Sequence, residues 1–516
     1  MILESCALSR HSRLPFDAVT VDRSLKIRLN RQLYDILRTY ILEGLIGAGT
    51  SLPATRTLAK QLGVGRNTVV AAYDQLLAEG YVEAQSGSGT RVASLPHSMI
   101  SSAKEHAPAD PPGLSRRGEL MASRPQPPRS PGKLNFHPGF PESATFPFST
   151  WARLLARNAR RRGDDILAYQ SFAGHWGLRE AIAEYLAVAR GVNCRPDQVI
   201  VVTGAQAALD LTARLLLDGG EAVWLEEPGY LGARSALLSG GAELAPLRVH
   251  KGGWELGDPS LPPPRMIYVT PSCQWPLGTI MGMDERLRLL AIAERHNAWI
   301  IEDDYDGEYR FRGQPVPALR GLDHTQRVIY VGTFGKTLFS SLRIGFLVAP
   351  PSLAPAFERA LSVTGQFAPL LLQATLADFI REGYFATHLK RMRRLYARRQ
   401  TEFLILCRRK LSAWMDVSEN DAGMQILGWL KPSLDDHAIA SAALRHGVDV
   451  QPVSINYQHD APRQGLLLGF AGVGDREMVR AVNGLRSAFQ SCDPKQASLS
   501  ANRRLAPSNG KKVALS

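Results

Sequence analysis

The sequence is poor in cysteine and contains no long apolar run. Its five cysteines are scattered over 516 residues, with an odd count and no CxxC pair: Cys6, Cys194, Cys273, Cys407 and Cys492. This arrangement argues against a disulfide framework and against a zinc site, so we expect no metal. No apolar stretch approaches the ~20 residues of a membrane-spanning helix, and residues 1–16 lack the apolar core of a signal peptide. The sequence therefore predicts a cytoplasmic protein with no membrane partner.

Acidic residues are outnumbered by basic ones. The chain has 48 Asp and Glu against 61 Lys and Arg, which gives a formal net charge of +13. A positive excess favours an acidic partner, with nucleic acid ahead of a membrane surface. The length predicts more than one domain.

The first region with regular patterning is residues 23–93. Apolar residues recur at helical spacing over 23–46, and two further helices are predicted at 55–62 and about 67–79, each followed by glycine. Residues 81–84 and 90–93 flank a glycine-rich turn and predict a short hairpin. Helix, helix–turn–helix and hairpin together predict a winged-helix domain.

In a winged-helix domain the third helix enters the major groove and its first residues meet base edges. Those residues are Arg66, Asn67 and Thr68; a guanidinium suits guanine and an amide suits adenine. Arg91 lies in the hairpin, where it could reach the DNA backbone or the minor groove. The alternative is a small helical domain whose arginines have no such role.

The remainder of the chain divides by composition. Residues 94–133 are rich in Pro, Ser and charge without periodicity, which predicts a linker that is partly extended and otherwise flexible. Residues 134–489 alternate helical and strand-like stretches, which predicts one large α/β unit with a smaller C-terminal subdomain. Residues 490–516 are polar and predicted to be disordered. Residues 388–410 are strongly basic on a helical pattern, which favours a solvated helix face over an auxiliary DNA patch.

Two apolar runs near the middle of the chain each end in reactive side chains. Residues 299–301 lead to Asp303, Asp304 and Tyr305. Residues 328–331 lead to Thr333, Lys336 and Arg343. Such runs are typical of buried parallel strands, which present functional groups at their carboxyl edge.

This set of side chains suits pyridoxal 5′-phosphate (PLP). A lysine amine can form a Schiff base with an aldehyde, and a carboxylate can keep a pyridine nitrogen protonated. A hydroxyl and a guanidinium suit a phosphate. The alternative is a surface lysine and a solvated acidic turn.

Two further turns fit the same ligand. The apolar run 199–202 leads straight into Thr203-Gly204-Ala205-Gln206 and a helix, and such a turn exposes backbone N–H groups to an anion. Tyr230 follows the apolar run 222–225, where its ring could stack on a pyridine face. The alternative is a turn tyrosine packed on the core.

The motifs around Lys336 resemble those of fold type I aminotransferases, in EDDYDGEY (302–309), GTFGKTL (332–338) and RIG (343–345). Residues 52–92, LPATRTLAKQLGVGRNTVVAAYDQLLAEGYVEAQSGSGTRV, resemble the GntR pattern of bacterial DNA-binding domains. A GntR-like domain followed by an aminotransferase-like domain resembles the MocR family of bacterial regulators.

The resemblance implies a role for individual residues. Lys336 would form the Schiff base with PLP, Asp303 would pair with the pyridine nitrogen, Tyr305 would bind the ring oxygen and Tyr230 would stack on the ring. The phosphate would be held by Ala205, Gln206, Thr333 and Arg343, with Tyr169 reaching it from the partner subunit of a head-to-tail homodimer. Arg56, Arg66 and Thr68 fall on DNA-contacting positions of the GntR family, and two such domains per dimer imply two half-sites.

The sequence departs from the aminotransferase pattern where a substrate carboxylate would bind. Leu467 stands in place of the usual arginine, and Gly232 in place of a second one used by amino-acid-sensing relatives. Whether Arg234 or Arg463 substitutes is left open. Losing such a charge-assisted pair removes roughly 1.5–3 kcal/mol, so weak or no transamination is expected.

The sequence thus predicts a PLP-dependent transcriptional regulator. Its effector would be PLP, which we favour, or a PLP–amino compound aldimine, and its targets would be vitamin B6 or amino-compound genes. One alternative is an active aminotransferase that carries a DNA-binding domain. Another is a DNA-binding protein whose body is only a dimerisation scaffold without cofactor.

Overall fold

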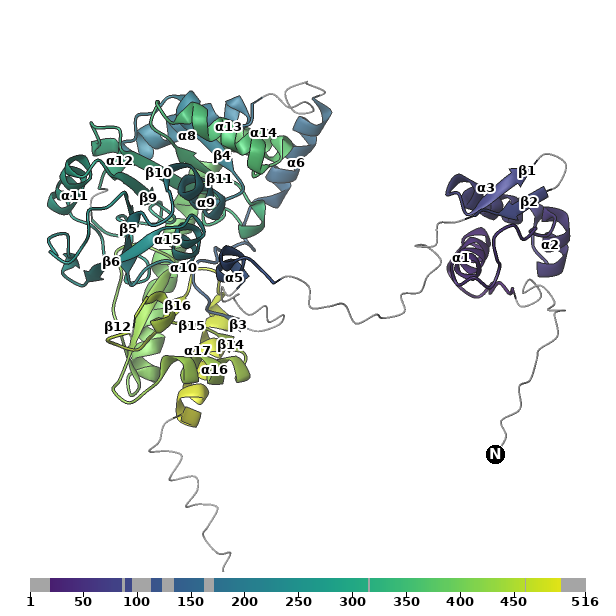
Figure 1. Cartoon of the computed structure of the whole chain (residues 1–516). Coiled ribbons are helices and arrows are strands. Elements are labelled where there is room, and N and C mark those ends of the chain that lie inside the picture. Colours follow the sequence, from purple (N-terminus) through teal and green to yellow (C-terminus); the bar gives the residue numbers. More distant parts are fainter. Residues whose placement is uncertain are drawn as a thin grey trace, which may run out of the picture. The chain divides into compact units, whose positions relative to one another are not determined.

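The computed structural model describes residues 19–85, 89–94, 113–122, 134–161, 171–313, 316–459 and 461–492. The chain divides into two compact units, Met1–Gly113 and Leu114–Ser516, which Figure 1 draws in purple and in blue to yellow. Within the described ranges, no helix is both long and apolar enough to cross a membrane.

The described part of the first unit contains three helices and a hairpin. They are α1 (Leu29–Leu42), α2 (Thr55–Leu62), α3 (Arg66–Ala78) and the antiparallel strands β1 (Val82–Gln85) and β2 (Gly89–Val92). The predicted order is confirmed, and α2 has the predicted bounds. The first helix is shorter than predicted because the Gln32 side chain donates to the carbonyls of Asp22 and Ile27 and so stabilises a non-helical approach. Leu33, Leu37 and Val69 are among the residues that form the buried core between the helices.

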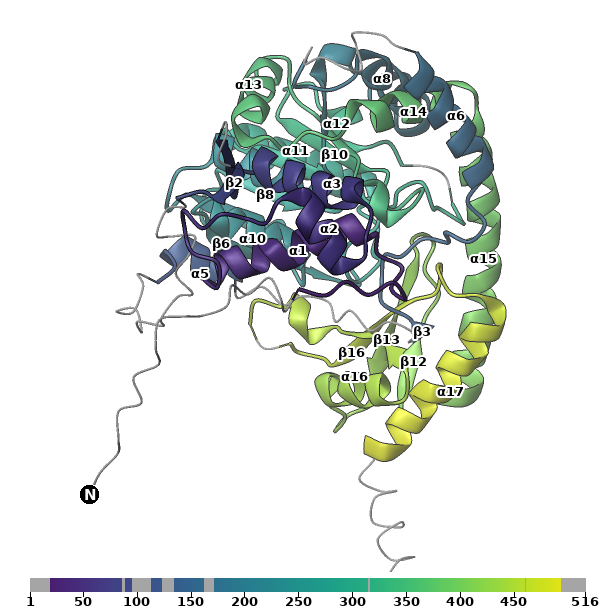
Figure 2. The ribbon, with the colours of Figure 1, turned by 90° about the vertical axis from the view of Figure 1, so that its right-hand side faces the viewer.

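The described part of the predicted linker contains a helix. Residues Arg116–Ala122 form α5, where the Ser115 hydroxyl accepts from the Gly118 N–H at 3.1 Å. The composition of 94–133, which predicts a partly extended and otherwise flexible linker, does not indicate this helix. Helix α5 packs against α10 (Leu231–Ser239) of the second unit, as both ribbon views show (Figures 1 and 2). Most of the remaining linker lies outside the described residues.

The second unit is built on an eight-stranded sheet with the order β4-β11-β10-β9-β8-β5-β6-β7. The strands are β4 (Val199–Val202), β5 (Ala222–Glu227), β6 (Glu243–His250), β7 (Gly253–Trp254), β8 (Met266–Val269), β9 (Trp299–Asp303), β10 (Val328–Thr333) and β11 (Gly345–Val348). The five strands β10, β9, β8, β5 and β6 run parallel, while β4, β11 and β7 each pair antiparallel to a neighbour. The predicted mostly parallel sheet is confirmed.

Helices cover both faces of this sheet because its strands are apolar on both sides. Along β4, Val199 and Val201 join the core shared with α8, whereas Ile200 and Val202 join the core shared with α9. The helices of the layers are α6 (Phe148–Arg160), α8 (Trp176–Arg190), α9 (Ala205–Leu216), α10, α11 (Met283–Arg295), α12 (Leu319–Leu322), α13 (Ala354–Thr364) and α14 (Leu370–Arg381). The result is the α/β architecture that the alternating pattern predicts.

Helix α8 begins later than predicted. The apolar pattern of residues 169–186 predicts a helix that opens at Tyr169, but residues 162–170 lie outside the described ranges and the helix begins at Trp176. The His175 side chain accepts from the Leu178 N–H at 3.3 Å and so caps the helix at this point. No turn chemistry in the sequence marks His175 as a cap.

A C-terminal subdomain follows the long helix α15 (Tyr384–Leu411), which lies beside α17 (Asp475–Cys492) in Figure 2. Its antiparallel sheet has the order β12 (Met415–Val417), β13 (Gln425–Leu430), β16 (Gly465–Gly469) and β15 (Gln451–Pro452). Beside α16 (Asp436–Arg445), β14 (Val448–Asp449) pairs with β3 (Leu134–Asn135). A segment near the beginning of the second unit is thereby part of the C-terminal subdomain.

Helix α17 continues to Cys492, so the prediction of a disordered tail from residue 490 begins too early. Residues 493–516 lie outside the described ranges.

Candidate functional site

Lys336 lies just beyond β10 and contacts a segment from far back in the chain. Its Nζ donates to the carbonyl of Gly139 at 2.8 Å. Gly139 has φ +80°, and a Cβ at this position would collide with Nζ, so only glycine allows the contact. Burial lowers the pKa of Lys336, and the carboxylates of Asp306 and Asp303 partly oppose that shift. A lysine with a lowered pKa holds more of its amine in the neutral, nucleophilic form.

Asp303 is the last residue of β9, and one of its two carboxylate oxygens accepts a hydrogen bond. Its Oδ2 accepts from the Tyr268 hydroxyl at 2.8 Å. Its Oδ1 is buried and has no hydrogen-bond partner among the described residues. Burial raises the pKa of Asp303 to about 6. A buried carboxylate oxygen without a donor fits a cationic ring N–H, which is the group that PLP would bring to this position.

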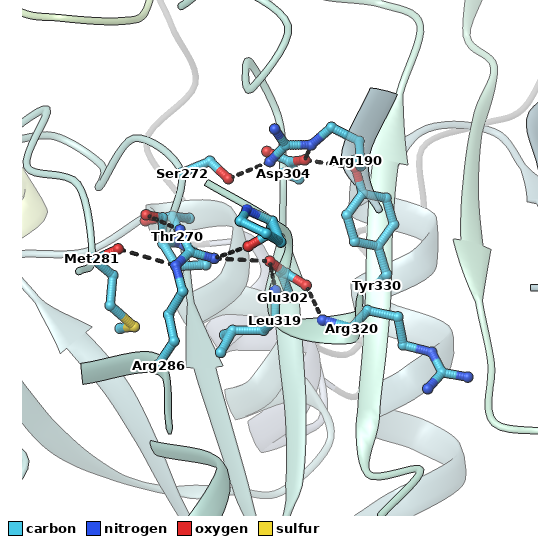
Figure 3. Close-up of polar contacts among 12 residues, drawn as sticks. Arg190, Thr270, Ser272, Met281, Arg286, Glu302, Asp304, Leu319, Arg320 and Tyr330 are labelled. Carbon is cyan, nitrogen blue, oxygen red and sulfur yellow. Dashed lines mark hydrogen bonds and ion pairs between the residues drawn. The ribbon is translucent and has the colours of Figure 1, made fainter. Parts of the chain in front are cut away.

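The next residue, Asp304, points to the opposite side of the strand and serves the framework. Its Oδ2 accepts from Arg190 Nε and from the Tyr330 hydroxyl, both at 2.6 Å (Figure 3). Arg190 also donates to the Ser272 hydroxyl at 2.6 Å. These buried partners fix the carboxyl end of β9, from which Asp303 projects.

Glu302, on the same strand, links β9 to the helix α12. Its carboxylate accepts the backbone N–H groups of Leu319 and Arg320, each at 2.8 Å, and lies 3.7 Å from the fully buried guanidinium of Arg286 (Figure 3). Burial raises the pKa of Glu302 to about 7, and the positive charge of Arg286 opposes that rise. Three successive acidic residues thus have three different environments.

Aromatic side chains gather on one side of Lys336. The Trp275 ring packs edge-on against Tyr305 at 5.8 Å and against Tyr230 at 6.1 Å between centroids. The Tyr305 hydroxyl accepts from Gln425 Nε2 at 3.3 Å. Tyr230, Trp275 and Lys336 line one cavity of about 460 Å³.

A second group of predicted residues surrounds the start of α9. Gly204 precedes this helix with φ +111°, and a Cβ there would lie 3.6 Å from the Arg343 guanidinium. Ala205 and Gln206 form the first turn of α9, where N–H groups have no partner within the helix. A helix N-terminus beside a guanidinium fits a phosphate group.

The remaining predicted phosphate ligands already have partners within the chain: Thr333 at the end of β10 and Gln206 in α9. The Thr333 hydroxyl accepts from the Gly335 N–H at 3.1 Å. Gln206 donates through Nε2 to the carbonyl of Gly232 at 2.9 Å, and its Oε1 has no partner within the described ranges. Tyr169 lies outside the described residues.

The predicted DNA-contacting residues are exposed on the first unit. Arg66 and Asn67 begin α3 and are exposed, while Thr68 in the same turn is half-buried. Arg56 is exposed in the first turn of α2, and Arg91 is exposed on β2, paired in register with Glu83. Gly63, with φ +63°, ends α2 and makes the turn between the two helices.

Two family models match the chain and between them cover both units. Residues 29–92 match "Bacterial regulatory proteins, gntR family", and residues 133–499 match "Aminotransferase class I and II". A Rhizobium meliloti protein named "Probable rhizopine catabolism regulatory protein MocR" is 56% identical over 91% of this chain and 96% of its own length. The chain belongs to the MocR family. It is a transcriptional regulator in which a DNA-binding gntR domain precedes an aminotransferase-like domain.

Other relatives include regulators and enzymes. The pyridoxine biosynthesis regulator PdxR of Corynebacterium glutamicum is 33% identical over 72% of this chain and 77% of its own. Among solved structures, LysN, an α-aminoadipate aminotransferase from Thermus thermophilus complexed with N-(5′-phosphopyridoxyl)-L-leucine, superimposes with a TM-score of 0.65. It is 28% identical and covers 72% of this chain and 97% of that one. The aminotransferase fold of this MocR-family body is thereby established.

The two arginines left open as substitutes have other partners in this MocR-family protein. Arg234 donates through Nη1 to the carbonyl of Tyr457 at 3.1 Å. The Arg463 guanidinium stacks over Trp429, 4.8 Å from the ring centroid. Leu467 is fully buried in an apolar cluster with Trp275 and Tyr305. Neither arginine is among the described residues that line the cavity beside Lys336.

Several arginines of the basic run in α15 are engaged within the body. Arg393 donates to the carbonyl of Glu308 at 2.6 Å, and Arg398 pairs with Glu402 and Asp475 at 3.1 and 3.0 Å. These contacts favour the solvated helix face over a second DNA patch for this part of the MocR-family chain.

Sequence reasoning missed the residues that complete the environment of Lys336 and Asp303. Tyr268 lies on β8, inside an apolar run, and only the pairing of β8 with β9 brings it to Asp303. Gly139 is 197 residues from Lys336. A hydroxyl within a buried strand is the one local signal that could have indicated Tyr268, since buried tyrosines need a partner.

Proposed function

We propose that this regulator holds PLP in the site between Lys336 and α9 and that the ligand state there changes DNA binding. Lys336, Asp303, Tyr305 and Tyr230 would surround the ring, and Ala205, Gln206, Thr333 and Arg343 would hold the phosphate. The observation that carries the proposal is the buried, unpartnered Oδ1 of Asp303 on the site that contains a partly desolvated lysine. An apolar scaffold would not retain such a costly carboxylate.

PLP, when bound, supplies an aldehyde that reacts with primary amines. The chain's own groups orient it: Asp303 supplies an anion for the ring nitrogen, and Tyr268 holds that anion in position. The carbonyl of Gly139 accepts from the lysine amine and keeps it directed towards the cavity. Trp275 and Tyr230 exclude water from one wall.

The proposed domain organisation is a winged-helix domain at 23–93, a linker at 94–133 and a PLP-binding body from 134. Helix α10 suggests how a change of ligand in the cavity could affect the linker. Leu231, its first residue, lines the cavity, and α5 of the linker packs on the same helix. Movement of α10 would alter the anchoring of the linker, and a coupling of ~1–3 kcal/mol would change DNA affinity about 5- to 150-fold.

The proposed assembly is a head-to-tail homodimer that places one DNA-binding domain on each of two half-sites. Tyr169 of the partner subunit would reach the phosphate. A closed two-fold dimer is the commonest arrangement of identical chains, and two-fold operators match it.

Efficient transamination is not part of the proposal. The carboxylate-binding arginine is replaced by Leu467, which packs in an apolar cluster, and Arg234 and Arg463 contact other groups. An active aminotransferase with a DNA-binding domain remains the second candidate because the proposed cofactor residues are all present.

Control of catabolic genes is a better proposed target than control of vitamin B6 synthesis. The relative named for rhizopine catabolism is 56% identical over nearly the full length, whereas the relative named for pyridoxine biosynthesis is 33% identical over a shorter range.

Removal and restoration of PLP should change DNA affinity at fixed salt. We expect restoration to shift the dissociation constant for the protein's own upstream DNA by about 5-fold or more, because the ligand biases the body that anchors the linker. Fluorescence anisotropy of labelled DNA measures the shift. An unchanged affinity with PLP demonstrably bound would contradict regulation by PLP alone.

Retention of PLP should depend on pH through Asp303. Burial raises the pKa of this carboxyl to about 6, so its anionic form, which pairs with a ring N–H, is lost as pH falls through that value. We expect the fraction of PLP retained after desalting to fall between about pH 7 and pH 5 in the wild type. Asp303→Asn should retain less PLP and show no such step.

Asp218→Asn is the matched control, since Asp218 is exposed and far from β9 in the sequence. It should reproduce the wild-type profile. A wild-type profile that is flat over this range would argue against Asp303 as the partner of the ring nitrogen.

A further inference from the structure

Residues 454–459 of the C-terminal subdomain are hydrogen-bonded to the turn that follows β5. The Gly229 N–H donates to the carbonyl of Asn456 at 2.9 Å. The carboxylate of Glu227, the last residue of β5, accepts from the Gln458 N–H at 2.7 Å and is 8% exposed. A hydrogen bond to a mostly buried carboxylate is stronger than one between neutral groups. The subdomain is therefore held against the end of β5 through this segment.

The Asn456 side chain connects the same segment to the ring of Trp275. Its Oδ1 accepts from Trp275 Nε1 at 2.9 Å, and its Nδ2 donates to the carbonyl of Val453 at 3.1 Å. Asn456 is 3% exposed, so moving Trp275 alone would leave buried polar groups unpaired. The Trp275 ring packs edge-on against Tyr230 and Tyr305, the two tyrosines proposed to surround the ring of PLP. A displacement of these rings by a ligand would therefore be passed to Asn456.

Arg234 connects the segment to α10. Its Nη1 donates to the carbonyl of Tyr457, the residue after Asn456, at 3.1 Å. Arg234 is the fourth residue of α10, and its own N–H donates to the carbonyl of Tyr230 at 3.1 Å. Helix α10 also packs against α5 of the linker. This helix therefore contacts both residues 454–459 and the linker helix.

Helix α5 is packed loosely enough to respond to such a displacement. Arg116, Arg117, Glu119 and Met121 are all exposed, and Met121 is 52% exposed. A helix that buries few side chains opens at a low cost in free energy. A small shift of α10 could therefore change how often α5 is docked.

We propose that residues 454–459 transmit the ligand state of the Lys336 site to the linker. Trp275 moves this segment through Asn456, and Arg234 transfers the movement to α10 and so to α5. Arg234 is a positioning residue, since it is not among the described residues that line the cavity. The inference rests on the proposed function, because it requires that PLP bound in the cavity changes DNA binding.

Arg234→Met tests the connection in the full-length protein. Methionine keeps an unbranched side chain but cannot donate to the Tyr457 carbonyl. We expect this variant to retain PLP as the wild type does, while the change in DNA affinity on restoring PLP falls from about 5-fold or more to less than about 2-fold. Arg295→Met is the matched control, because Arg295 is exposed in the last turn of α11, and it should keep the wild-type response. A full response in Arg234→Met would overturn the inference.

Hydrogen–deuterium exchange shows where the connection is interrupted. In the wild type, restoring PLP should change the exchange rates of the amides in residues 454–459 and in α5 by about 3-fold or more. In Arg234→Met the change in residues 454–459 should remain and the change in α5 should disappear. An α5 response that survives in this variant would show that the linker is reached by another route, contrary to the inference.

Trp275→Phe, measured at saturating PLP, interrupts the connection at its other end. Phenylalanine keeps an aromatic ring but lacks the Nε1–H donor, so the PLP-dependent changes in residues 454–459 and in α5 should both decrease. DNA binding without PLP reports whether each variant is folded. A wild-type DNA affinity that does not respond to bound PLP overturns the proposed function and this inference together. A wild-type response that Arg234→Met and Trp275→Phe both retain overturns this inference alone.

Discussion

A Lys336→Ala protein is expected to lose the visible absorbance that PLP gives the wild type. Lys336 is the lysine that lines the cavity, and burial lowers its pKa, so a share of its amine is neutral and ready to react with an aldehyde. Without it, retention of PLP on desalting should fall by about 100-fold or more, which corresponds to ~2.7 kcal/mol. Absorbance spectra and the PLP content of denatured protein measure both effects.

Lys431→Ala controls for the loss of a lysine as such. Lys431 is 41% exposed and pairs with Asp416 at 2.6 Å, on the C-terminal subdomain away from the cavity lining. This variant should keep the wild-type spectrum. If Lys336→Ala kept it as well, the cofactor would be held by another group and the proposed site would be wrong.

Arg66→Ala should weaken specific DNA binding by ~1–3 kcal/mol, about 10- to 100-fold, and relax selectivity at one base position. Arg66 begins α3, is exposed, and precedes Asn67 in the turn that a winged-helix domain presents to the major groove. Anisotropy with the upstream DNA and with a scrambled duplex separates the two effects. PLP retention should not change, because the substitution lies in the other compact unit.

Arg31→Ala is the matched control on the same unit. Arg31 is about half-exposed on α1, where it pairs with Asp35 at 3.0 Å. Arg31→Ala removes one positive charge, as Arg66→Ala does, but leaves the residues of α3 unchanged. Equal losses of affinity in the two variants would show that the effect comes from net charge and that Arg66 reads no base.

Much of this fold follows from local sequence. Helix α2 has the predicted bounds because an apolar period is followed by Gly63, whose φ of +63° ends the helix. The strands β4 and β8 coincide with runs of four apolar residues that are buried on both faces. The predictions for Asp303 and Lys336 rest on the same kind of strand, since Asp303 ends β9 and Lys336 lies shortly after β10.

The structural features that the sequence did not predict depend on contacts between segments that are far apart in the chain. The Tyr268 bond to Asp303 needs the pairing of β8 with β9, and the Gly139 bond to Lys336 needs the return of the chain across the body. The late start of α8 depends on a histidine cap, and the short α1 depends on a glutamine side chain. None of these has a periodic signature, because side-chain capping and tertiary hydrogen bonds leave no repeat in the sequence.

The packing of Leu467 also bears on how this protein could change in evolution. The resemblance to aminotransferases puts an arginine at this position. Here Leu467, on the strand β16, is fully buried in a cluster with Tyr305, Trp275 and Val453. An arginine introduced in place of Leu467 would bury an unpaired charge among apolar groups and destabilise the fold. A carboxylate-binding arginine could therefore not arise on this strand by one substitution, because the surrounding apolar side chains would have to change with it.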